Sequence, residues 1–467
     1  MLLKNIAESG NRLALLFFAF AAALLVFAAP SRAQTPLAYI TDLGNSITVV
    51  DTSTNEVKGS LDPTIASSLM GIAVNPDSGT VYAVDLNKTV HVIDSPDDNP
   101  SYSMIHLPDV NPFGLVITPD GGTLYIANAG ASSVTVVDLG TSAVSSIDIG
   151  CDSDGTNNCS STPSITVTPT SSAGPVYVYV ATNTGVSVID TSDNTLKENV
   201  PVTCGHDQAC GPIWLAASPD GQTLFISIFG ENQVLGMNIS MENLIEDIAE
   251  VGMSPEGLAV TPGGKTVYVA NMNGQSVSVF EVESCGPECT VSTVSGTVVS
   301  EPSIIALTPD GGSAYVGGDG DSLSVIDTKS SSVTATVSGL PGSPFAIAIS
   351  DGDSDGDGIP DSVEGSEDTD GDGVKDSLDT DSDGDGATDA EEAGPDPKSP
   401  VDSDGDGIHD YKDPTIGGDT GGNGGGGCSL SSGDTTGTAF SYLLYFIIPA
   451  MMLAKRFYRK ASPNKAE

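Results

Sequence analysis

The sequence is poor in basic side chains over most of its length. It holds 62 acidic against 16 basic residues. No arginine occurs between residues 34 and 398, and residues 34–350 contain five lysines against 34 carboxylates. A phosphate or nucleic-acid ligand requires a cluster of cationic donors, which this stretch lacks. We therefore expect no nucleic-acid partner, and we expect anionic ligands to be repelled.

Histidine is also scarce, with four residues in the chain. Three of them, His91, His106 and His206, stand at non-equivalent positions of the sequence repeats described below. Without clustering they give no argument for an acid–base site. The sequence therefore favours a protein that is not an enzyme and leaves that question open.

Long apolar runs are confined to the two ends of the chain. Residues 1–33 combine a charged start, an apolar run over residues 13–29 and a small-residue end at Ala33. This pattern is typical of a secretory signal peptide. An uncleaved anchor helix is the alternative, and either one exports everything downstream.

A motif of three short strands recurs along the chain. In its clearest form, strands are predicted at residues 257–261, 266–270 and 276–281, separated by a Pro-Gly-Gly turn and an Asn-Met-Asn-Gly turn. Four strands per unit at a period of 43 to 50 residues predict the blades of a β-propeller. The turn prolines that mark the period are Pro76, Pro119, Pro169, Pro219, Pro262 and Pro309.

The count of first strands predicts how the propeller closes. Residues 345–350 form a first strand with no blade after it, whereas the strands near residue 40 have no first strand before them. We predict that these two ends complete one blade, so that residues 34–350 form an all-β, seven-bladed propeller closed by its N- and C-terminal strands. The seven first strands begin at Gly71, Gly114, Ser164, Trp214, Gly257, Ile304 and Phe345.

The second strands carry a signature, Y-V-A-N at Tyr268–Asn271 and Y-I-A-N at Tyr125–Asn128. With it, residues 35–350 resemble the YVTN family of seven-bladed propellers. The resemblance implies the fold and says little of function, because such propellers include surface-layer proteins, lactonase-like enzymes and redox-associated proteins. One blade departs from the signature, with Phe225-Ile226-Ser227 in its place.

The loops before the inner strands are expected to surround one mouth of the propeller channel. Phe113, Trp214, Glu256 and Phe345 follow prolines in or next to these loops. Aromatic groups around a carboxylate could bind a small ligand or a peptide. The alternative is that they only pack the closed ring.

Six of the seven cysteines form three local pairs. In an exported chain such pairs predict disulfides, each contributing about 2 kcal/mol. For the second pair, metal binding together with His206 is the alternative. The pairs are Cys151/Cys159, Cys204/Cys210 and Cys285/Cys289.

Residues 351–413 form an acidic segment with 24 acids and three lysines. It contains four similar twelve-residue loops, beginning at Asp353, Asp368, Asp381 and Asp402. Carboxylates at positions 1, 3, 5, 9 and 12, with glycine at position 6, follow the ligand order of a calcium loop. A disordered acidic linker is the alternative, which the regular order disfavours.

Calcium is therefore the predicted cofactor, and magnesium should compete poorly. Ligand sharing between neighbouring loops is expected. The tandem loops resemble thrombospondin type 3 repeats and lack the long flanking helices of an EF-hand, so we expect a stiffened stalk. The predicted ligands are Asp353, Asp355, Asp357, the Ile359 carbonyl, Asp361 and Glu364; Asp368, Asp370, Asp372, Asp376 and Asp379; Asp381, Asp383, Asp385, Asp389 and Glu392; and Asp402, Asp404, Asp406, Asp410 and Asp413.

The C-terminal part consists of a Gly-rich linker (414–438), an apolar run (439–454) and a basic end (455–467). The run is barely long enough for a transmembrane helix, and the basic residues would stay cytoplasmic. Together these features resemble GlyGly-CTERM sorting tails, which implies cleavage by a membrane protease. Cys428 is either an attachment point or a free thiol.

The sequence thus predicts an exported calcium-binding propeller, anchored in the membrane by its tail or displayed at the cell surface, on the periplasmic or extracellular side. A binding or structural role with an unknown protein or glycan ligand is the favoured interpretation. The alternative is a propeller enzyme, lactonase-like or redox-associated, with its site at the channel mouth.

Overall fold

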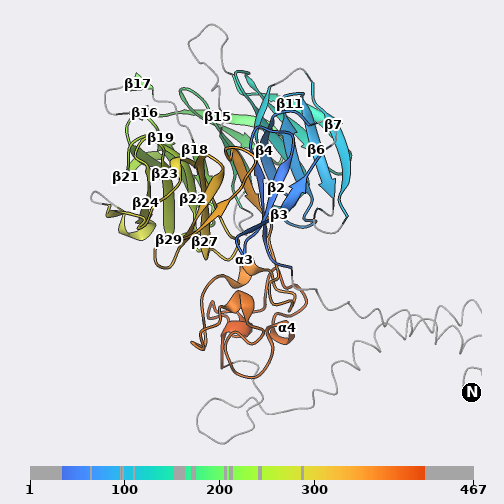
Figure 1. Cartoon of the computed structure of the whole chain (residues 1–467), viewed down its shortest axis with the longest axis vertical. Coiled ribbons are helices and arrows are strands. Elements are labelled where there is room, and N and C mark those ends of the chain that lie inside the picture. The colour runs from blue at the N-terminus through green and yellow to red at the C-terminus, as the bar shows by residue number, and fades with distance from the viewer. Residues whose placement is uncertain are drawn as a thin grey trace, which may run out of the picture. The chain divides into compact units, whose positions relative to one another are not determined.

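The computed structural model consists mainly of seven four-stranded antiparallel sheets (Figure 1). It describes residues 34–415 apart from 64–65, 95, 97–98, 109–110, 151–163, 170–174, 205–207, 210–213, 240–243 and 286–288. A two-stranded hairpin, β16 (Thr203–Cys204) with β17 (Gln208–Ala209), adds to them. Short helical turns occur at η1 (Val282–Ser284), α3 (Asp361–Glu364), η2 (Asp376–Leu378), α4 (Asp389–Glu392) and η3 (Asp410–Lys412).

Each sheet is one blade, with its strands in order from the first strand outward. The blade that contains both ends of the ring is β30 (Ala346–Ile349), β1 (Leu37–Thr41), β2 (Ile47–Asp51) and β3 (Glu56–Leu61). The next three are β4 (Leu69–Val74), β5 (Val81–Asp85), β6 (Thr89–Asp94) and β7 (Ser101–His106); β8 (Pro112–Ile117), β9 (Thr123–Asn128), β10 (Ser133–Asp138) and β11 (Ala143–Asp148); and β12 (Ile165–Val167), β13 (Tyr177–Ala181), β14 (Gly185–Asp190) and β15 (Thr195–Pro201). The last three are β18 (Trp214–Ala217), β19 (Thr223–Ile228), β20 (Gln233–Asn238) and β21 (Leu244–Glu250); β22 (Pro255–Val260), β23 (Thr266–Asn271), β24 (Ser276–Glu281) and β25 (Val291–Thr293); and β26 (Ser300–Leu307), β27 (Ser313–Asp319), β28 (Ser322–Asp327) and β29 (Ser332–Ser338).

The first strands of the blades form a closed ring. Each contacts the first strand of the next blade, in the order β30, β4, β8, β12, β18, β22, β26 and back to β30. The predicted seven-bladed propeller is therefore confirmed.

The ring is closed by a seam between the two ends of the propeller. Strand β30 pairs antiparallel with β1, with Ala38 opposite Ile349 and Thr41 opposite Ala346. Beyond the strand, the Ser350 amide donates to the Leu37 carbonyl at 2.9 Å. The predicted closure by N- and C-terminal strands is confirmed, with the strand two residues shorter than expected.

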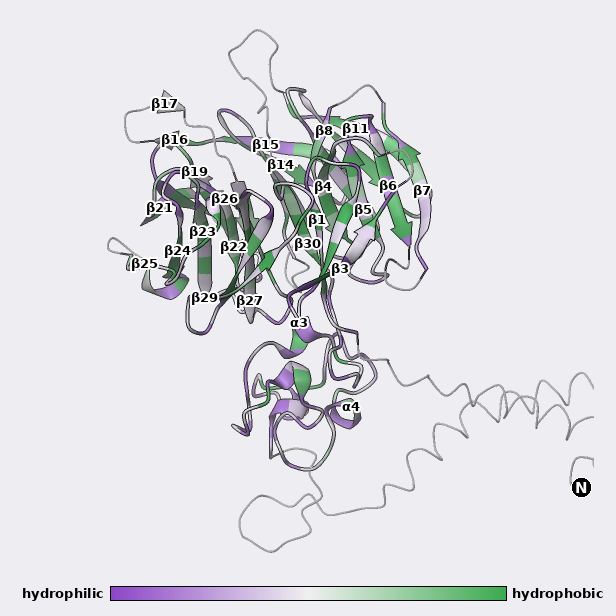
Figure 2. Ribbon diagram, viewed as in Figure 1, coloured by the Kyte–Doolittle hydropathy of each residue, from purple (hydrophilic) through white to green (hydrophobic). Residues whose placement is uncertain are grey.

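Apolar side chains are buried between neighbouring blades, whereas the outer strands face solvent. At the seam, Ala38, Ile40 and Val50 pack against Tyr315 and Leu323 of the preceding blade. Outer strands such as β3 and β7 are almost wholly exposed. Figure 2 shows hydrophobic residues along the strands of the propeller. Removal of these faces from water is the main force that holds blade to blade.

The hairpin turns owe their shape to the repeated Pro-Asp-Gly sequence. In the turn of residues 118–122, the carboxylate of Asp120 accepts hydrogen bonds from the Thr118 hydroxyl at 2.5 Å and the Gly122 amide at 3.0 Å. Gly121 has φ of 65°, which favours glycine. The same bonds recur at Asp220 and Asp310.

Carboxylates also hold the turns after the third strands. Asp51, Asp138, Asp190 and Asp327, which end third strands, each accept hydrogen bonds from groups of the following turn. Asp94 differs, since it accepts from the Thr80 hydroxyl at 2.9 Å.

The tyrosine of the signature acts as a strut between blades. The Tyr268 hydroxyl, on β23, donates at 3.0 Å to the carbonyl of Thr328, which lies in a turn of the next blade. Tyr315 reaches the Thr52 carbonyl across the closing interface at 3.2 Å, and Tyr125 reaches Asn194. The signature therefore reports on contacts between blades as well as on strand formation.

We predict that Tyr268→Phe lowers the free energy of unfolding by about 1 kcal/mol, because it removes this partly buried hydrogen bond and the longer contact of the same hydroxyl with the Ser331 hydroxyl at 3.4 Å. Chemical denaturation of both proteins measures the difference. Tyr102→Phe, on the exposed strand β7, is the matched control and should have no effect. Equal stability of Tyr268→Phe and the wild type would show that the hydrogen bond between Tyr268 and Thr328 does not stabilise the propeller.

Candidate functional site

The acidic segment folds into loops whose aspartates are held by the backbone. In the first loop, one oxygen of Asp353, Asp355 and Asp357 accepts from the amide of Gly356, Asp357 and Ile359, at 2.8, 3.0 and 2.7 Å. Glycines at positions 4 and 6 of all four loops have φ between 70° and 105°. These left-handed residues turn the chain so that alternate side chains point inward.

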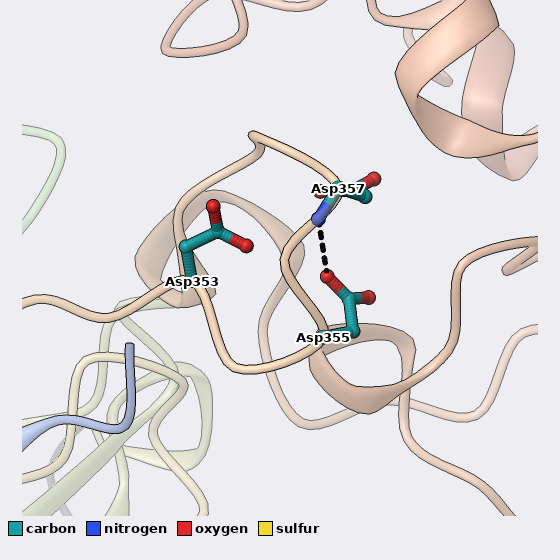
Figure 3. A group of neighbouring side chains, drawn as sticks. All are labelled: Asp353, Asp355 and Asp357. Carbon is teal, nitrogen blue, oxygen red and sulfur yellow. Dashed lines mark hydrogen bonds between the residues drawn. The ribbon is translucent and has the colours of Figure 1, made fainter. Parts of the chain in front are cut away.

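The aspartates at positions 1, 3 and 5 converge in every loop. In each of the four loops they offer one oxygen apiece within 4.8 Å of the others. Figure 3 shows this arrangement for Asp353, Asp355 and Asp357. A further group joins two loops, because Asp357 and Glu364 of the first loop lie within the same distance of Asp389 of the third.

The first loop buries carboxylate oxygens that have no partner in the described part of the chain. They are one oxygen each of Asp355 and Asp357 and both oxygens of Glu364. The Glu364 side chain is almost completely buried, with 1 % exposed. Buried charges without a counter-charge are strongly unfavourable, so this set of donors suits a cation.

The third loop repeats the arrangement. One oxygen each of Asp383 and Asp385 and both oxygens of Glu392 are buried without a hydrogen bond to any described residue. Hard oxygen donors of this kind, with no sulfur or nitrogen among them, fit calcium.

The pKa values of these groups show how strongly the site needs positive charge. Burial, followed by the charges of Asp355, Asp357 and other carboxylates, raises the pKa of Glu364 to about 11. Burial also raises the pKa to about 7 for Asp355 and Glu392 and to about 6 for Asp357, and neighbouring carboxylates add to the increase. Protons or a cation must therefore neutralise the cluster.

The second and fourth loops are different in kind. Position 12 is the shorter Asp379 or Asp413, and one oxygen of each accepts a hydrogen bond from the residues that follow. The aspartates at positions 3 and 5 of these loops are exposed. We find in them no carboxylate oxygen that is both buried and unbonded among the described residues.

Position 9 has a role that the spacing did not predict. Asp361 accepts from both the amide and the hydroxyl of Ser354 at 2.7 Å, which ties position 9 to position 2. The same pair of hydrogen bonds links Asp376 to Thr369, Asp389 to Ser382 and Asp410 to Ser403. These carboxylates, assigned above as ligands, close the loops, and the hydroxyl at position 2 of every loop was the signal for it.

The acidic segment is compact, where the sequence led us to expect a stalk. Ile359, Ala393 and Tyr411 form a small core, and the Tyr411 hydroxyl donates to the Val363 carbonyl at 3.2 Å. Lys412 pairs with Asp376 at 2.6 Å. These contacts bring the fourth loop against the first and the second, since a few apolar residues at loop ends suffice to pack short loops on one another.

At the channel mouth, the predicted residues form two groups. The rings of Phe113 and Phe345 meet edge to face with centroids 5.4 Å apart. The Ser227 hydroxyl accepts from the Trp214 amide at 3.1 Å and donates to the Glu256 carbonyl at 2.7 Å. Burial, and then the charge of Glu301, raises the pKa of Glu256. Glu301 was missed, although it precedes a loop proline as the others follow one.

Several predictions concern residues outside the described part of the chain. These are the signal peptide at 1–33, the tail from residue 416 with Cys428 and the apolar run 439–454, and Cys151, Cys159 and Cys210. The sulfur atoms of Cys285 and Cys289 lie 2.09 Å apart. None of the described helices is long and apolar enough to span a membrane.

Comparison with known proteins supports the fold. Residues 176–298, about a quarter of the chain, match the family described as lactonase, 7-bladed beta-propeller. No curated protein matches the chain.

Similar solved structures include a hydrazine synthase chain of Kuenenia stuttgartiensis, with 18 % identity and a TM-score of 0.47 over 66 % of this chain and 99 % of that chain. Two structures of AztD from Citrobacter koseri are also similar. The apo form has 14 % identity and a TM-score of 0.49, over 68 % of this chain and 99 % of that one. The other has 13 % identity and a TM-score of 0.47, over 68 % and 98 %.

We predict that the acidic segment, freed of metal, is more stable at about pH 5 than at about pH 8. The carboxyl groups have pKa values near 4 in the unfolded chain and raised pKa values of about 6 to 7 in the folded segment, so the folded state binds protons more tightly. The stability of the segment therefore falls as the pH rises from about 4 to above 7. Hydrogen exchange in EDTA, corrected for intrinsic rates, should show protection of residues 351–413 at the lower pH and its loss at the higher. Peptides from β23 are the control, and equal protection at both pH values would contradict the prediction.

Proposed function

We propose that this chain is an exported calcium-binding β-propeller protein with a binding or structural role at the cell surface. The observation that carries the proposal is the set of buried carboxylate oxygens without partners at Glu364 and Glu392 and the aspartates beside them. A doubly charged cation would satisfy them and remove their mutual repulsion.

Calcium is favoured over magnesium by the number and flexibility of the donors. Around the first loop, Asp353, Asp355 and Asp357 form one group of converging oxygens, and Glu364 and Asp389 form a second group with the same Asp357. Such a set suits the six to eight oxygens of calcium, whereas magnesium prefers a strict octahedron that keeps several waters. The first and third loops, with glutamate at position 12, hold the stronger sites.

The remaining parts of the proposal follow from the sequence. The signal peptide would export the chain, the three cysteine pairs would form disulfides outside the cytoplasm, and the tail would retain the protein at the membrane or pass it to the surface. The resemblances to YVTN propellers, to thrombospondin type 3 repeats and to GlyGly-CTERM tails support a displayed propeller that captures a protein or a glycan.

The second candidate is an enzyme at the channel mouth. It is favoured by the match of residues 176–298 to the lactonase family and by the raised pKa of Glu256 beside Glu301. No cationic side chain lies among the residues we identify at this mouth, so a developing oxyanion would find no positive charge there.

Isothermal titration of the full chain in detergent tests the proposal. We expect calcium to bind with release or uptake of heat and magnesium to bind more weakly. Glu364→Gln and Glu392→Gln should each weaken one strong site by at least about tenfold, since each removes a bidentate ligand. Glu231→Gln, an exposed propeller residue, is the control. Absence of any calcium heat would refute the proposed sites.

The enzyme candidate makes a separate prediction. A lactone hydrolase activity of the purified chain would fall at least about a hundredfold in Glu256→Gln, because the general base is lost. We expect no such activity in either protein, as measured on a panel of lactones of different ring sizes. A hydrolysis rate that depends on Glu256 would favour the enzyme over the binding protein.

A further inference from the structure

The seam that closes the propeller continues into the first acidic loop. Past β30 and β1, Gln34 and Asp353 form an antiparallel bridge, with their amides donating to each other's carbonyls at 2.7 and 3.0 Å. Asp353 is also position 1 of the first loop, where its carboxylate joins Asp355 and Asp357. One residue therefore belongs both to the seam and to the metal cluster.

The other end of the first loop is tied to the same place. The Asp361 amide donates to the Gly352 carbonyl at 3.0 Å. The carboxylate of Asp351, directly after the closing strand, accepts from the Ser362 hydroxyl at 2.5 Å and from its amide at 3.2 Å. Residues 351–353 are thus held by both ends of the loop that the ion would organise.

The first loop also reaches the propeller channel. Ser362 lines a cavity of about 530 Å³ together with residues of the inner strands, including Trp214, Leu258 and Ile349. Two lysines of the acidic segment pair with hairpin turns of the propeller: Lys375 with Asp310 at 3.1 Å and Lys398 with Asp77 at 2.6 Å. The acidic segment is therefore packed against the propeller, and Ser362 of its first loop lines the same cavity as Ile349 of the closing strand.

We infer that the ion held by the first loop locks the closing seam, so that calcium governs the stability of the propeller itself as well as that of the acidic segment. The inference rests on the calcium binding proposed above and adds the propeller as the partner of that site. Loss of the ion leaves the carboxylates of Asp355, Asp357 and Glu364 to repel one another. The loop then opens and releases Asp353 from Gln34.

The third loop provides the comparison that isolates this effect. Glu392 has the same position and the same two unpartnered oxygens as Glu364, but its loop has no such continuation into the seam among the bonds of the described residues. Glu364→Gln and Glu392→Gln are therefore matched in chemistry and differ in their connection to the ring.

The test uses Trp214, the single tryptophan of the chain, which lies on β18 and reports on the propeller. Thermal unfolding of the full chain is followed by its fluorescence in EDTA and in calcium. We expect calcium at about 100-fold excess over its dissociation constant to raise the midpoint by about 5 °C. Glu364→Gln, whose site binds calcium at least about tenfold more weakly, should lose about half of this rise or more at the same calcium concentration, whereas Glu392→Gln should keep the full rise while one strong site weakens in calorimetry.

A second variant acts on the connection alone. A Cβ at Gly352 would lie 2.5 Å from Pro36 Cδ and 2.6 Å from the Gln34 carbonyl oxygen. Gly352→Ala should therefore retain calcium binding and lose the calcium-dependent rise. If the wild type shows a heat of calcium binding but calcium does not raise the midpoint of thermal unfolding followed by Trp214 fluorescence, the inference is overturned and the proposed sites remain intact. Loss of the rise in Glu392→Gln as well would also overturn it. Absence of calcium heat would refute the sites themselves.

Discussion

The pairing of β30 with β1 is the constraint on which the rest of the structure depends. Without it, the first and last blades would each present an unpaired strand edge, and the apolar cluster shared by Ala38, Ile40 and Tyr315 would be open to water. Every other blade is complete in a continuous stretch of chain. Only this blade is made from both ends, so a few backbone hydrogen bonds determine whether seven sheets form a ring.

Charge is distributed in a way that suits this architecture. The propeller satisfies many of its carboxylates locally, since aspartates such as Asp120 and Asp327 accept hydrogen bonds from their own turns. These bonds lower the pKa of Asp120. In the acidic segment the carboxylates are instead turned toward one another, and burial raises the pKa of Glu364. A carboxylate group therefore stabilises the propeller without an added ion, whereas the carboxylates of the acidic segment require a cation.

The number of blades, the hairpin turns and the closing strand could be predicted from the sequence, because they depend on short repeated motifs and on the number of first strands. It also located the converging aspartates. It did not separate loops with Glu364 or Glu392 from those with Asp379 or Asp413, because burial depends on how the loops pack. The roles of Asp361 and of Glu301 escaped for a similar reason: spacing does not show which way a carboxylate points.

The seam has a consequence for how the chain folds. Leu37 and Ser350, which are hydrogen-bonded beside it, are 313 positions apart in sequence. During synthesis β1 is made first, and one of its edges stays unpaired until β30 has been synthesised near the end of the propeller. Closing so long a loop carries a large entropic penalty and comes late, which exposes the nascent chain to misassembly for most of its production.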